Sequence, residues 1–308
     1  MESTRNGFGH ALLELAEQRD DILAASADTY RSFALNDFVE QYKDRYYEFG
    51  IAEQCMITTS AAMASEGYQV FCVGYSPFLS MRAVEQIRTF VCYPNLNVKI
   101  VAGLSGLSGD TDGVTHQGTE DISIIRSIPN IILVNPADAV AARELTKKIA
   151  ETKSPAYLRL GRGATPVIYE EAETKNFSIG KAHLIRDYGT DAAVIATGCC
   201  VAEAMRAADS LHDEGIHIRV LDMHTIKPLD EEAVMQCARE CGRIVTVEDN
   251  SIYGGLGGAV AEVLTENGIR VDAFRRLGMT SFGTSGSLPE LLHFFGMDRE
   301  AIIKVIRS

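Results

Sequence analysis

The feature that most constrains the fold of this chain is a regular alternation of short β-branched runs with longer stretches of helical periodicity. In the first half, the runs at residues 69–73, 98–102 and 131–134 are separated by stretches whose apolar residues recur every three or four positions. The same alternation starts again at residues 192–196. It predicts parallel strands joined by helices that cover the sheet faces, so we expect an α/β protein.

The chain is expected to form two such units, because its 308 residues are about twice the usual length of a domain. Glycines, a proline and an acidic run gather between residues 161 and 180, a composition typical of a linker. We therefore expect a first α/β unit at residues 1–168, a linker at residues 169–182, and a smaller α/β unit at residues 183–308.

Composition excludes several classes of protein. Lysine and arginine number 29 against 42 acidic residues, a net charge of −13, and no basic run is present, which argues against nucleic acid as a partner. The apolar stretches are too short to span a bilayer, and the first residues show no secretory signal pattern. The seven cysteines form no Cys-x-x-Cys pair, as expected for reduced thiols of a cytoplasmic protein without a zinc site. We predict a cytoplasmic protein with no membrane or nucleic-acid partner.

A glutamate stands where a strand runs into a helix. The segment Tyr46–Phe49 reads as a strand and residues 51–65 as a helix, so Glu53 is expected at the carboxyl end of the strand. In open parallel sheets, ligands bind at that edge. The alternative interpretation is that Glu53 only complements the helix dipole.

Two further polar or aromatic segments follow predicted strands. Tyr75 and Phe78 come after residues 69–73, and their rings either stack on a flat heterocycle or fill the core. The glycine-rich segment Gly109–Gln117 carries Asp112 and His116. A histidine near a carboxylate suits hydroxyl recognition and proton transfer, whereas a capped turn is the structural alternative.

Taken in order, these segments resemble the thiamine-diphosphate-dependent transketolases. The resemblance rests first on Glu48–Gln54, Tyr75–Phe78 and Thr111–Gln117. It continues through Pro155-Ala156-Tyr157-Leu158-Arg159-Leu160-Gly161-Arg162, then Leu221–Pro228, and then Val247-Glu248-Asp249 before the turn Tyr253–Gly258. The chain is most similar to the carboxyl-terminal subunit of a split transketolase. This implies a pyrimidine-binding domain, a parallel sheet flanked by helices, followed by a smaller transketolase C-terminal α/β domain.

The resemblance also implies residues that bind the cofactor. Glu53 matches a glutamate that hydrogen-bonds a ring nitrogen of the aminopyrimidine and so promotes removal of the thiazolium carbon proton. Phe78 matches the aromatic ring stacked on the pyrimidine, and Tyr75 a neighbouring ring contact. Asp28 matches an acidic residue near the subunit junction.

Residues that bind the substrate are implied in the same way. Asp112 and His116 match groups that contact the sugar hydroxyls near the reacting carbons, so Glu53 and His116 are the expected catalytic residues. The positions that hold a substrate phosphate in the family are matched here by Arg5, Ser32 and Arg162. A guanidinium can bind such an anion through two parallel hydrogen bonds.

One position departs from the family pattern. Leu104 stands where these enzymes carry a histidine that helps to bind the phosphate end of the substrate. A leucine cannot make that polar contact. We therefore expect the substrate to be a ketose with an altered sugar phosphate or another terminal anion, such as a sulfonate.

The Gly-Asp-Gly motif that holds the metal and the diphosphate in thiamine enzymes does not occur in this sequence. A diphosphate needs a cation and its oxygen ligands. We therefore expect a second polypeptide, the N-terminal transketolase subunit, to carry the diphosphate-binding domain and to hold Mg²⁺ or Ca²⁺. The expected assembly is a heterotetramer with no metal site of this chain's own, and the isolated chain is expected to be inactive.

Other classes of protein share some of these segments. The segment Gly255–Val260 resembles a dinucleotide-binding turn, but the third glycine of that motif falls on Val260. A 1-deoxyxylulose-5-phosphate synthase shares the Glu53 and His116 segments but is normally one long chain. The β subunit of a 2-oxo acid dehydrogenase should lack the Asp112–Gln117 pattern, and a non-catalytic scaffold has no need of Glu53.

Overall fold

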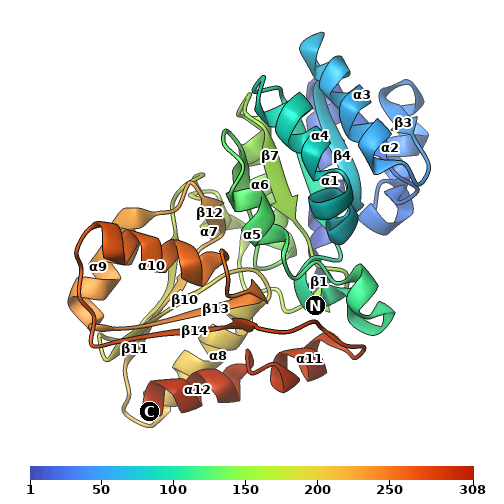
Figure 1. Ribbon diagram of the computed structural model, residues 1–308. Coiled ribbons are helices and arrows are strands. Elements are labelled where there is room, and N and C mark those ends of the chain that lie inside the picture. The colour runs from blue at the N-terminus through green and yellow to red at the C-terminus, as the bar shows by residue number, and fades with distance from the viewer.

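The structure is a computed structural model that describes residues 1–308. It contains two α/β units of different size, each built on its own sheet, and a small two-stranded sheet (Figure 1). The larger sheet belongs to the amino-terminal half and the smaller to the carboxyl-terminal half, as the alternation predicted. No helix of the structure combines the length and the apolar character that crossing a membrane requires.

The larger sheet has seven strands. They are, in spatial order, β12 (Thr225–Lys227), β6 (Ile132–Val134), β7 (Ala156–Arg159), β5 (Val98–Gly103), β4 (Gln69–Tyr75), β2 (Ile22–Ser26) and β3 (Tyr46–Glu48). All neighbouring pairs are parallel except β12 and β6. The carboxyl ends of the parallel strands therefore lie along one edge of the sheet.

Helices cover both faces of this sheet. They are α1 (Thr4–Gln18), α2 (Asn36–Gln41), α3 (Glu53–Ser65), α4 (Val84–Gln86), α5 (Asp121–Arg126) and α6 (Ala139–Ala150). Helices α1, α2 and α6 pack on one face through Phe8, Phe38 and Ile149, whereas α3 and α5 pack on the other. Strand β4 is apolar on both sides because both faces are covered.

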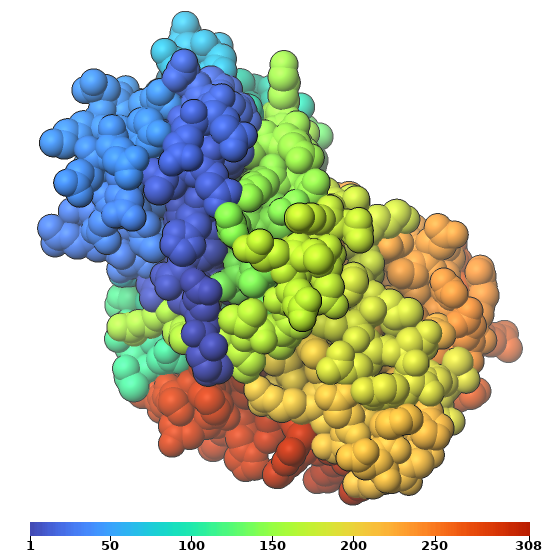
Figure 2. Space-filling view, turned by 180° about the vertical axis from the view of Figure 1, so that it is seen from behind, coloured from blue at the N-terminus to red at the C-terminus, as the bar shows by residue number.

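Helices α1 and α6 approach closely at a glycine. A side-chain carbon at Gly7 would lie 2.0 Å from the carbonyl oxygen of Ala139. Only glycine allows the two backbones to meet at this distance. In Figure 2 the blue N-terminal segment accordingly runs along the green part of the chain that contains α6.

The smaller sheet has five strands. They are, in spatial order, β14 (Ala273–Met279), β13 (Arg243–Ser251), β10 (Ala192–Ala196), β11 (Ile218–Asp222) and β9 (His183–Asp187), of which only β9 is antiparallel to its neighbour. Its helices are α8 (Cys200–Asp213), α9 (Glu231–Cys241), α10 (Leu256–Glu266), α11 (Leu288–Phe294) and α12 (Arg299–Arg307). Helices α9 and α10 cover one face, and α8, α11 and α12 the other (Figure 1).

Short elements complete the fold. The strands β1 (Glu2–Ser3) and β8 (Ala164–Thr165) pair antiparallel, and α7 (Glu171–Thr174) is a single turn. The remaining turns are η1 (Tyr30–Phe33), η2 (Lys43–Arg45), η3 (Phe78–Arg82), η4 (Ile87–Cys92), η5 (Gly106–Asp112) and η6 (Val114–His116). Two of them, η3 and η4, are π-helical and flank the α-helical α4, so the helical stretch between β4 and β5 changes its winding along its length.

Aspartates begin several of the helices. Asp138, Asp230 and Asp298 precede α6, α9 and α12, and each side chain accepts a hydrogen bond from a backbone N–H group in the first turn. These caps satisfy donors that have no partner within the helix. Asp138 also accepts hydrogen bonds from the backbone N–H groups of Ile168 and Tyr169, which fixes the start of the linker on α6.

The predicted runs at residues 69–73, 98–102, 131–134 and 192–196 form strands, namely β4, β5, β6 and β10. The sequence patterns did not predict β9, β12 or the last two helices. Strand β12 lies in the segment assigned to the second unit, yet it pairs with β6 of the larger sheet. The two halves of the chain are thus joined through a sheet as well as through the linker.

Candidate functional site

The residues expected to bind cofactor and substrate come from one region of the larger sheet. Most of them follow the carboxyl ends of its parallel strands, where ligands bind in folds of this kind. Asp28 follows β2, Glu53 follows β3, Tyr75 ends β4 and Phe78 follows it, Asp112 and His116 follow β5, Arg162 follows β7, Ser32 lies in η1, and Arg5 lies in the first turn of α1.

Glu53 is the first residue of α3, and its side chain is only 3% exposed. Its carboxylate Oε2 lies 2.7 Å from Nη1 of Arg82. The amino terminus of the helix also favours a negative charge at this place. Glu53 is therefore held as a nearly buried carboxylate with one cationic partner.

Three aromatic rings form a cluster beside this carboxylate. The ring centroids of Tyr75 and Phe78 are 6.2 Å apart, and the His116 ring lies 6.1 Å from Tyr75 and 5.4 Å from Phe78. The Phe78 ring is partly exposed, and the guanidinium carbon of Arg82 lies 4.5 Å from its centroid. Arg82 thus contacts both Glu53 and Phe78.

Tyr75 connects the cluster to η1. Its hydroxyl lies 3.1 Å from Oγ of Ser32, and its ring stacks on Phe33 with centroids 6.5 Å apart. Because Phe33 is fully buried, it gives Tyr75 a rigid support. The structure therefore brings Ser32, Tyr75, Phe78 and His116 together.

Arg5 and Arg162 form the cationic part of the region. Nη1 of Arg162 lies 2.5 Å from Oδ2 of Asp112, and this hydrogen bond holds the pKa of the Asp112 carboxyl below its usual value. Arg5 donates a hydrogen bond to the backbone carbonyl of Arg162, and its Nε is buried without a partner. Burial lowers the pKa of the Arg5 guanidinium. An anion placed here could accept from Nε of Arg5.

Asp28 lies apart from the other candidates. It is exposed, has a φ of +57°, and its backbone N–H group donates to Oε1 of Glu48 at 2.8 Å. Glu48 also accepts from the backbone N–H group of Gly50 at 2.8 Å and from the hydroxyl of Tyr46. Burial alone would raise the pKa of the Glu48 carboxyl. The hydrogen bonds together lower it by more, so the net shift of the pKa is downward. Glu48 thereby ties the loop after β2 to the segment that leads into Glu53.

A pocket of about 400 Å³ opens beside Phe78. Met81, Arg82 and Thr115 line it, together with Phe282 from the carboxyl-terminal half. The loop that carries Phe282 is fixed to the larger unit, because Nε2 of Gln117 donates to the backbone carbonyl of Thr284 at 2.8 Å. The carboxyl-terminal half therefore contributes a wall to the candidate site.

Comparison with known proteins assigns the chain to a family. The family model described as "Transketolase, pyrimidine binding domain" matches residues 1–167, more than half of the chain. The model described as "Transketolase, C-terminal domain" matches residues 180–302. The chain belongs to the transketolase family. The resemblance found in the sequence motifs is thus confirmed, and with it the α/β fold of the two units.

Relatives of this transketolase chain include proteins named as transketolase subunits or sections. A putative transketolase C-terminal section of Methanocaldococcus jannaschii is 43% identical and covers 98% of this chain and 94% of its own. One subunit of the apulose-4-phosphate transketolase from Phocaeicola vulgatus is 39% identical, covering 99% and 96%. The 6-deoxy-6-sulfo-D-fructose transketolase subunit SqwH of Clostridium sp. is 37% identical, covering 97% and 92%. These relatives show that the chain is of the ketol-transferase type.

A solved structure agrees along the whole length. The structure described as a split gene transketolase, inactive β4 tetramer, has a TM-score of 0.91 and 34% identity, and it covers 100% of this chain and 98% of its own. Transketolase from Pichia stipitis in complex with sedoheptulose 7-phosphate has a TM-score of 0.82 at 22% identity, which shows the shared fold. This chain spans 45% of that longer protein.

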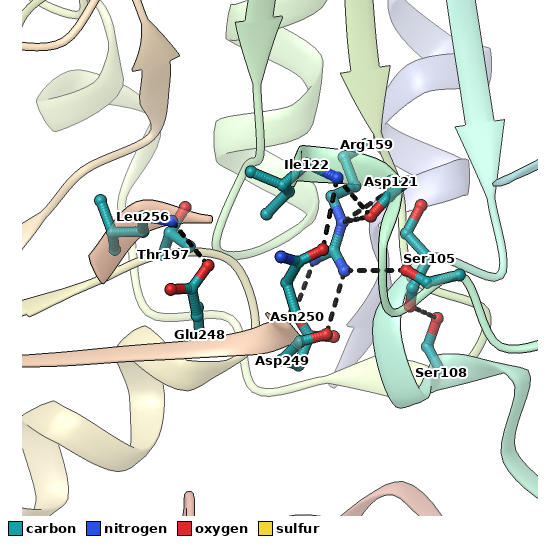
Figure 3. A network of polar contacts seen from close by, with 12 residues as sticks. Ser105, Ser108, Asp121, Ile122, Arg159, Thr197, Glu248, Asp249, Asn250 and Leu256 are labelled. Atoms are coloured by element: carbon teal, nitrogen blue, oxygen red, sulfur yellow. Dashed lines mark hydrogen bonds and ion pairs between the residues drawn. The ribbon is translucent and has the colours of Figure 1, made fainter. Parts of the chain in front are cut away.

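A buried polar network connects the two halves of this transketolase chain (Figure 3). Arg159, at the end of β7, is 2% exposed and pairs with Asp121 of α5 and Asp249 of β13 at 3.0 and 2.5 Å. Oδ2 of Asp121 accepts a hydrogen bond at 2.7 Å from Ser76, which is the neighbour of Tyr75. The ion pairs therefore link the smaller sheet to the segment that carries the aromatic cluster.

Sequence reasoning assigned no role to three residues that shape this site. Arg82 follows Phe78 by four positions, a spacing that places two side chains on one helical face and could have indicated their contact. Gln117 belongs to the recognised Thr111–Gln117 motif, but its partner lies 167 residues further along the chain. Phe282 gave no signal, because neither a motif nor a period marks it. The roles assigned to Glu53, His116 and the other candidates stay predictions.

The residues present fit the pyrimidine part of thiamine diphosphate. A nearly buried carboxylate can bind a ring nitrogen, and a partly exposed phenylalanine face beside it can stack on the ring. The group of side chains that could hold a metal ion is His293, Asp298 and Glu300, at the surface of the smaller unit. Those three residues lie outside the candidate site.

Proposed function

We propose that this chain is the pyrimidine-binding and C-terminal subunit of a two-chain, thiamine-diphosphate-dependent transketolase. It would transfer a two-carbon ketol unit from a ketose with a terminal anion to an aldose acceptor. The observation that carries the proposal is the convergence of Glu53, Phe78, Tyr75 and His116 at the carboxyl edge of a parallel sheet. We further propose that residues 1–168 and 183–308, with the linker at residues 169–182, are its two domains.

Each of these side chains has a definite task in the proposed reaction. Thiamine diphosphate, when bound, supplies the electron sink that cleavage of a ketose carbon–carbon bond requires. Glu53 would hold a proton between its carboxylate and the ring nitrogen, Phe78 would stack on the ring, and Tyr75 would support it. His116, at the edge of the same cluster, would donate and accept protons at the substrate hydroxyls near the reacting carbons.

The anionic end of the substrate would bind at Arg5, Arg162 and Ser32. The buried, unpartnered Nε of Arg5 supports this assignment, because an unpaired buried donor is costly unless a ligand satisfies it. Asp112 would bind a substrate hydroxyl once an anion competes for Arg162. Asp28, exposed beside the loop that Glu48 fixes, would face the cofactor from the subunit junction.

The nature of the anion follows from Leu104. This residue is 2% exposed and has a φ of +54°, so it offers an apolar, buried side chain where the family carries a histidine. Two relatives support a departure from ordinary pentose phosphates, since their names assign them to apulose 4-phosphate and to 6-deoxy-6-sulfo-D-fructose. We propose an altered sugar phosphate or a sulfonated ketose as the donor.

The diphosphate and its Mg²⁺ or Ca²⁺ would be held mainly by a partner subunit in a heterotetramer. The proposal is supported by relatives named as subunits and by the neighbour described as an inactive β4 tetramer. The active site would then lie between the two chains, at the edge of the larger sheet. We also propose a cytoplasmic location.

A second candidate is a 1-deoxyxylulose-5-phosphate synthase-like activity. The enzyme of that name from Thermomicrobium roseum is 37% identical over 297 residues, although this chain spans 47% of its length. That reaction would need the same Glu53 and Phe78. It is distinguished by its donor, a 2-oxo acid that loses carbon dioxide.

The test is reconstitution. The chain is assayed alone and after mixing with a polypeptide that carries the Gly-Asp-Gly motif, with thiamine diphosphate and Mg²⁺ present throughout. Ketol transfer is measured from xylulose 5-phosphate, from a sulfonated ketose and from apulose 4-phosphate, and carbon dioxide release is measured from pyruvate. We expect ketol transfer only when the two polypeptides are mixed. Activity of the isolated chain would refute the partner requirement, and efficient use of xylulose 5-phosphate would refute the altered anion.

A further inference from the structure

Arg82 contacts both Glu53 and Phe78, the two side chains that are expected to bind the cofactor ring. Its Nη1 donates to Oε2 of Glu53 at 2.7 Å, and its guanidinium carbon lies 4.5 Å from the centroid of Phe78. A flat cation that stacks on an aromatic face while donating to a carboxylate has the shape and charge of a protonated aminopyrimidine. One side chain of the free chain thus makes both contacts assigned to the ring.

We infer that Arg82 occupies the aminopyrimidine subsite of the free chain and leaves it when the ring binds. This inference rests on the proposed function, because it takes Glu53 and Phe78 as the residues that bind the ring. It adds a residue that sets cofactor affinity through competition, a role that the sequence motifs did not indicate.

Charge explains why the subsite is filled. Glu53 is 3% exposed, and a nearly buried carboxylate without a cation is costly. Arg82 neutralises that charge before the cofactor arrives, and a ring nitrogen carrying the shared proton would replace it. The thiazolium ring of the cofactor is itself a cation, so an arginine left in place would repel it.

The position of Arg82 allows this exchange. Its side chain is 45% exposed, whereas that of Glu53 is 3% exposed, so the guanidinium can move into solvent while the carboxylate stays in place. Arg82 ends the π-helical turn η3, and such turns are frequent at functional sites. Its departure would enlarge the 400 Å³ pocket that it lines together with Phe78 and Met81.

The test is binding of thiamine to the isolated full-length chain, followed by NMR of the thiamine pyrimidine proton. Arg82→Ala should bind thiamine about three- to tenfold more tightly than the unmodified chain, because a partly exposed ion pair and a cation–π contact no longer compete. Arg88→Ala removes an exposed arginine six residues away and is the matched control, expected to leave affinity unchanged. Unchanged, weaker or undetectable binding by Arg82→Ala would overturn the inference.

Two double variants separate this inference from the proposed function. Adding Glu53→Gln or Phe78→Ala to Arg82→Ala should abolish the gain in thiamine affinity. If the gain persists in both, the ring binds elsewhere, and the proposed roles of Glu53 and Phe78 fail. If both changes weaken thiamine binding in the unmodified chain while Arg82→Ala brings no gain, only the role of Arg82 fails. Circular dichroism melting of each variant shows that it is folded.

Discussion

Arg159 and Asp249 form a buried ion pair between the two sheets, with 2.5 Å between Nη1 and Oδ1. Arg159 also pairs with Asp121, so one guanidinium serves two buried carboxylates from different halves of the chain. Asp121 in turn accepts a hydrogen bond from Ser76, next to Tyr75 in the candidate site. The relative position of the two units and the placement of the aromatic cluster therefore depend on the same charge.

Replacing Arg159 should destabilise the whole chain. Arg159→Met leaves Asp121 and Asp249 buried without a cation, and breaking such a pair costs about 3–5 kcal/mol. The measurement is urea denaturation at neutral pH. Arg206→Met, which breaks an exposed pair with Glu203, is the control and should change stability by less than about 1 kcal/mol. Equal effects of the two variants would show that the buried ion pairs do not stabilise the chain.

Glu53→Gln should remove turnover while leaving the fold intact. The amide cannot hold a proton for the ring nitrogen, so turnover of the reconstituted complex is expected to fall by about 10²- to 10⁴-fold. Glu66→Gln changes an exposed residue at the end of the same helix and should have no effect. A loss of only about twofold for Glu53→Gln would contradict the assigned role.

Arg162→Ala should weaken binding of an anionic ketose. Losing one charge-assisted hydrogen bond to the substrate is expected to raise KM by about tenfold, with kcat nearly unchanged. A ketose without a terminal anion should show no such change. Arg275→Ala, which changes an exposed residue of β14, is the control. Equal increases in KM for the anionic and the neutral ketose would show that Arg162 does not bind the anion.

Asp222 should make stability depend on pH. It is fully buried, and burial raises its pKa to about 7, although Tyr169 donates to its Oδ2 at 2.7 Å. Because its pKa in the unfolded chain is about 4, the folded state binds more protons between pH 4 and 7. The stabilisation is complete below pH 4 and is lost as the pH rises through 7.

The variant Asp222→Asn tests this dependence. Between pH 5 and 8, the free energy of unfolding should fall less in the variant than in the unmodified chain. The difference between the two falls should be on the order of a few kcal/mol. Comparing the two proteins cancels the opposite contribution of His224, whose pKa burial lowers to about 4. Denaturation in urea at four pH values provides the measurement. Parallel stability curves would show that Asp222 is ionised in the folded chain at every pH tested.

The sheets were predictable because buried parallel strands have a local signature. Strand β4 is apolar on both faces, so its composition alone marks it. The edge strands carry no such mark. None of the residues of β9 is buried, so no apolar run marks this strand. Strand β12 has only three residues, and its Thr225 pairs with Val134 of β6, which lies 91 residues earlier in the chain. The π-helical winding of η3 likewise depends on packing rather than on periodicity.

The site was predictable as a region but not as a set of contacts. Strand ends and motifs placed Glu53, Phe78 and His116 near one sheet edge. They did not predict that Arg82 joins Glu53 to Phe78, or that Arg162 pairs with Asp112, because such pairs depend on how loops from different strands converge. Phe282 could not be predicted, since the packing of the second unit against the first brings its loop to the site.

The antiparallel pairing of β12 with β6 has a consequence for how the chain can be divided. Cutting at the linker would leave β6 paired only with β7 and expose its other edge, a row of unpaired backbone groups that is a template for self-association. The severed carboxyl-terminal piece would keep a loose strand with nothing to pair with. The two halves would have to find each other again before either could regain the edge that it lost.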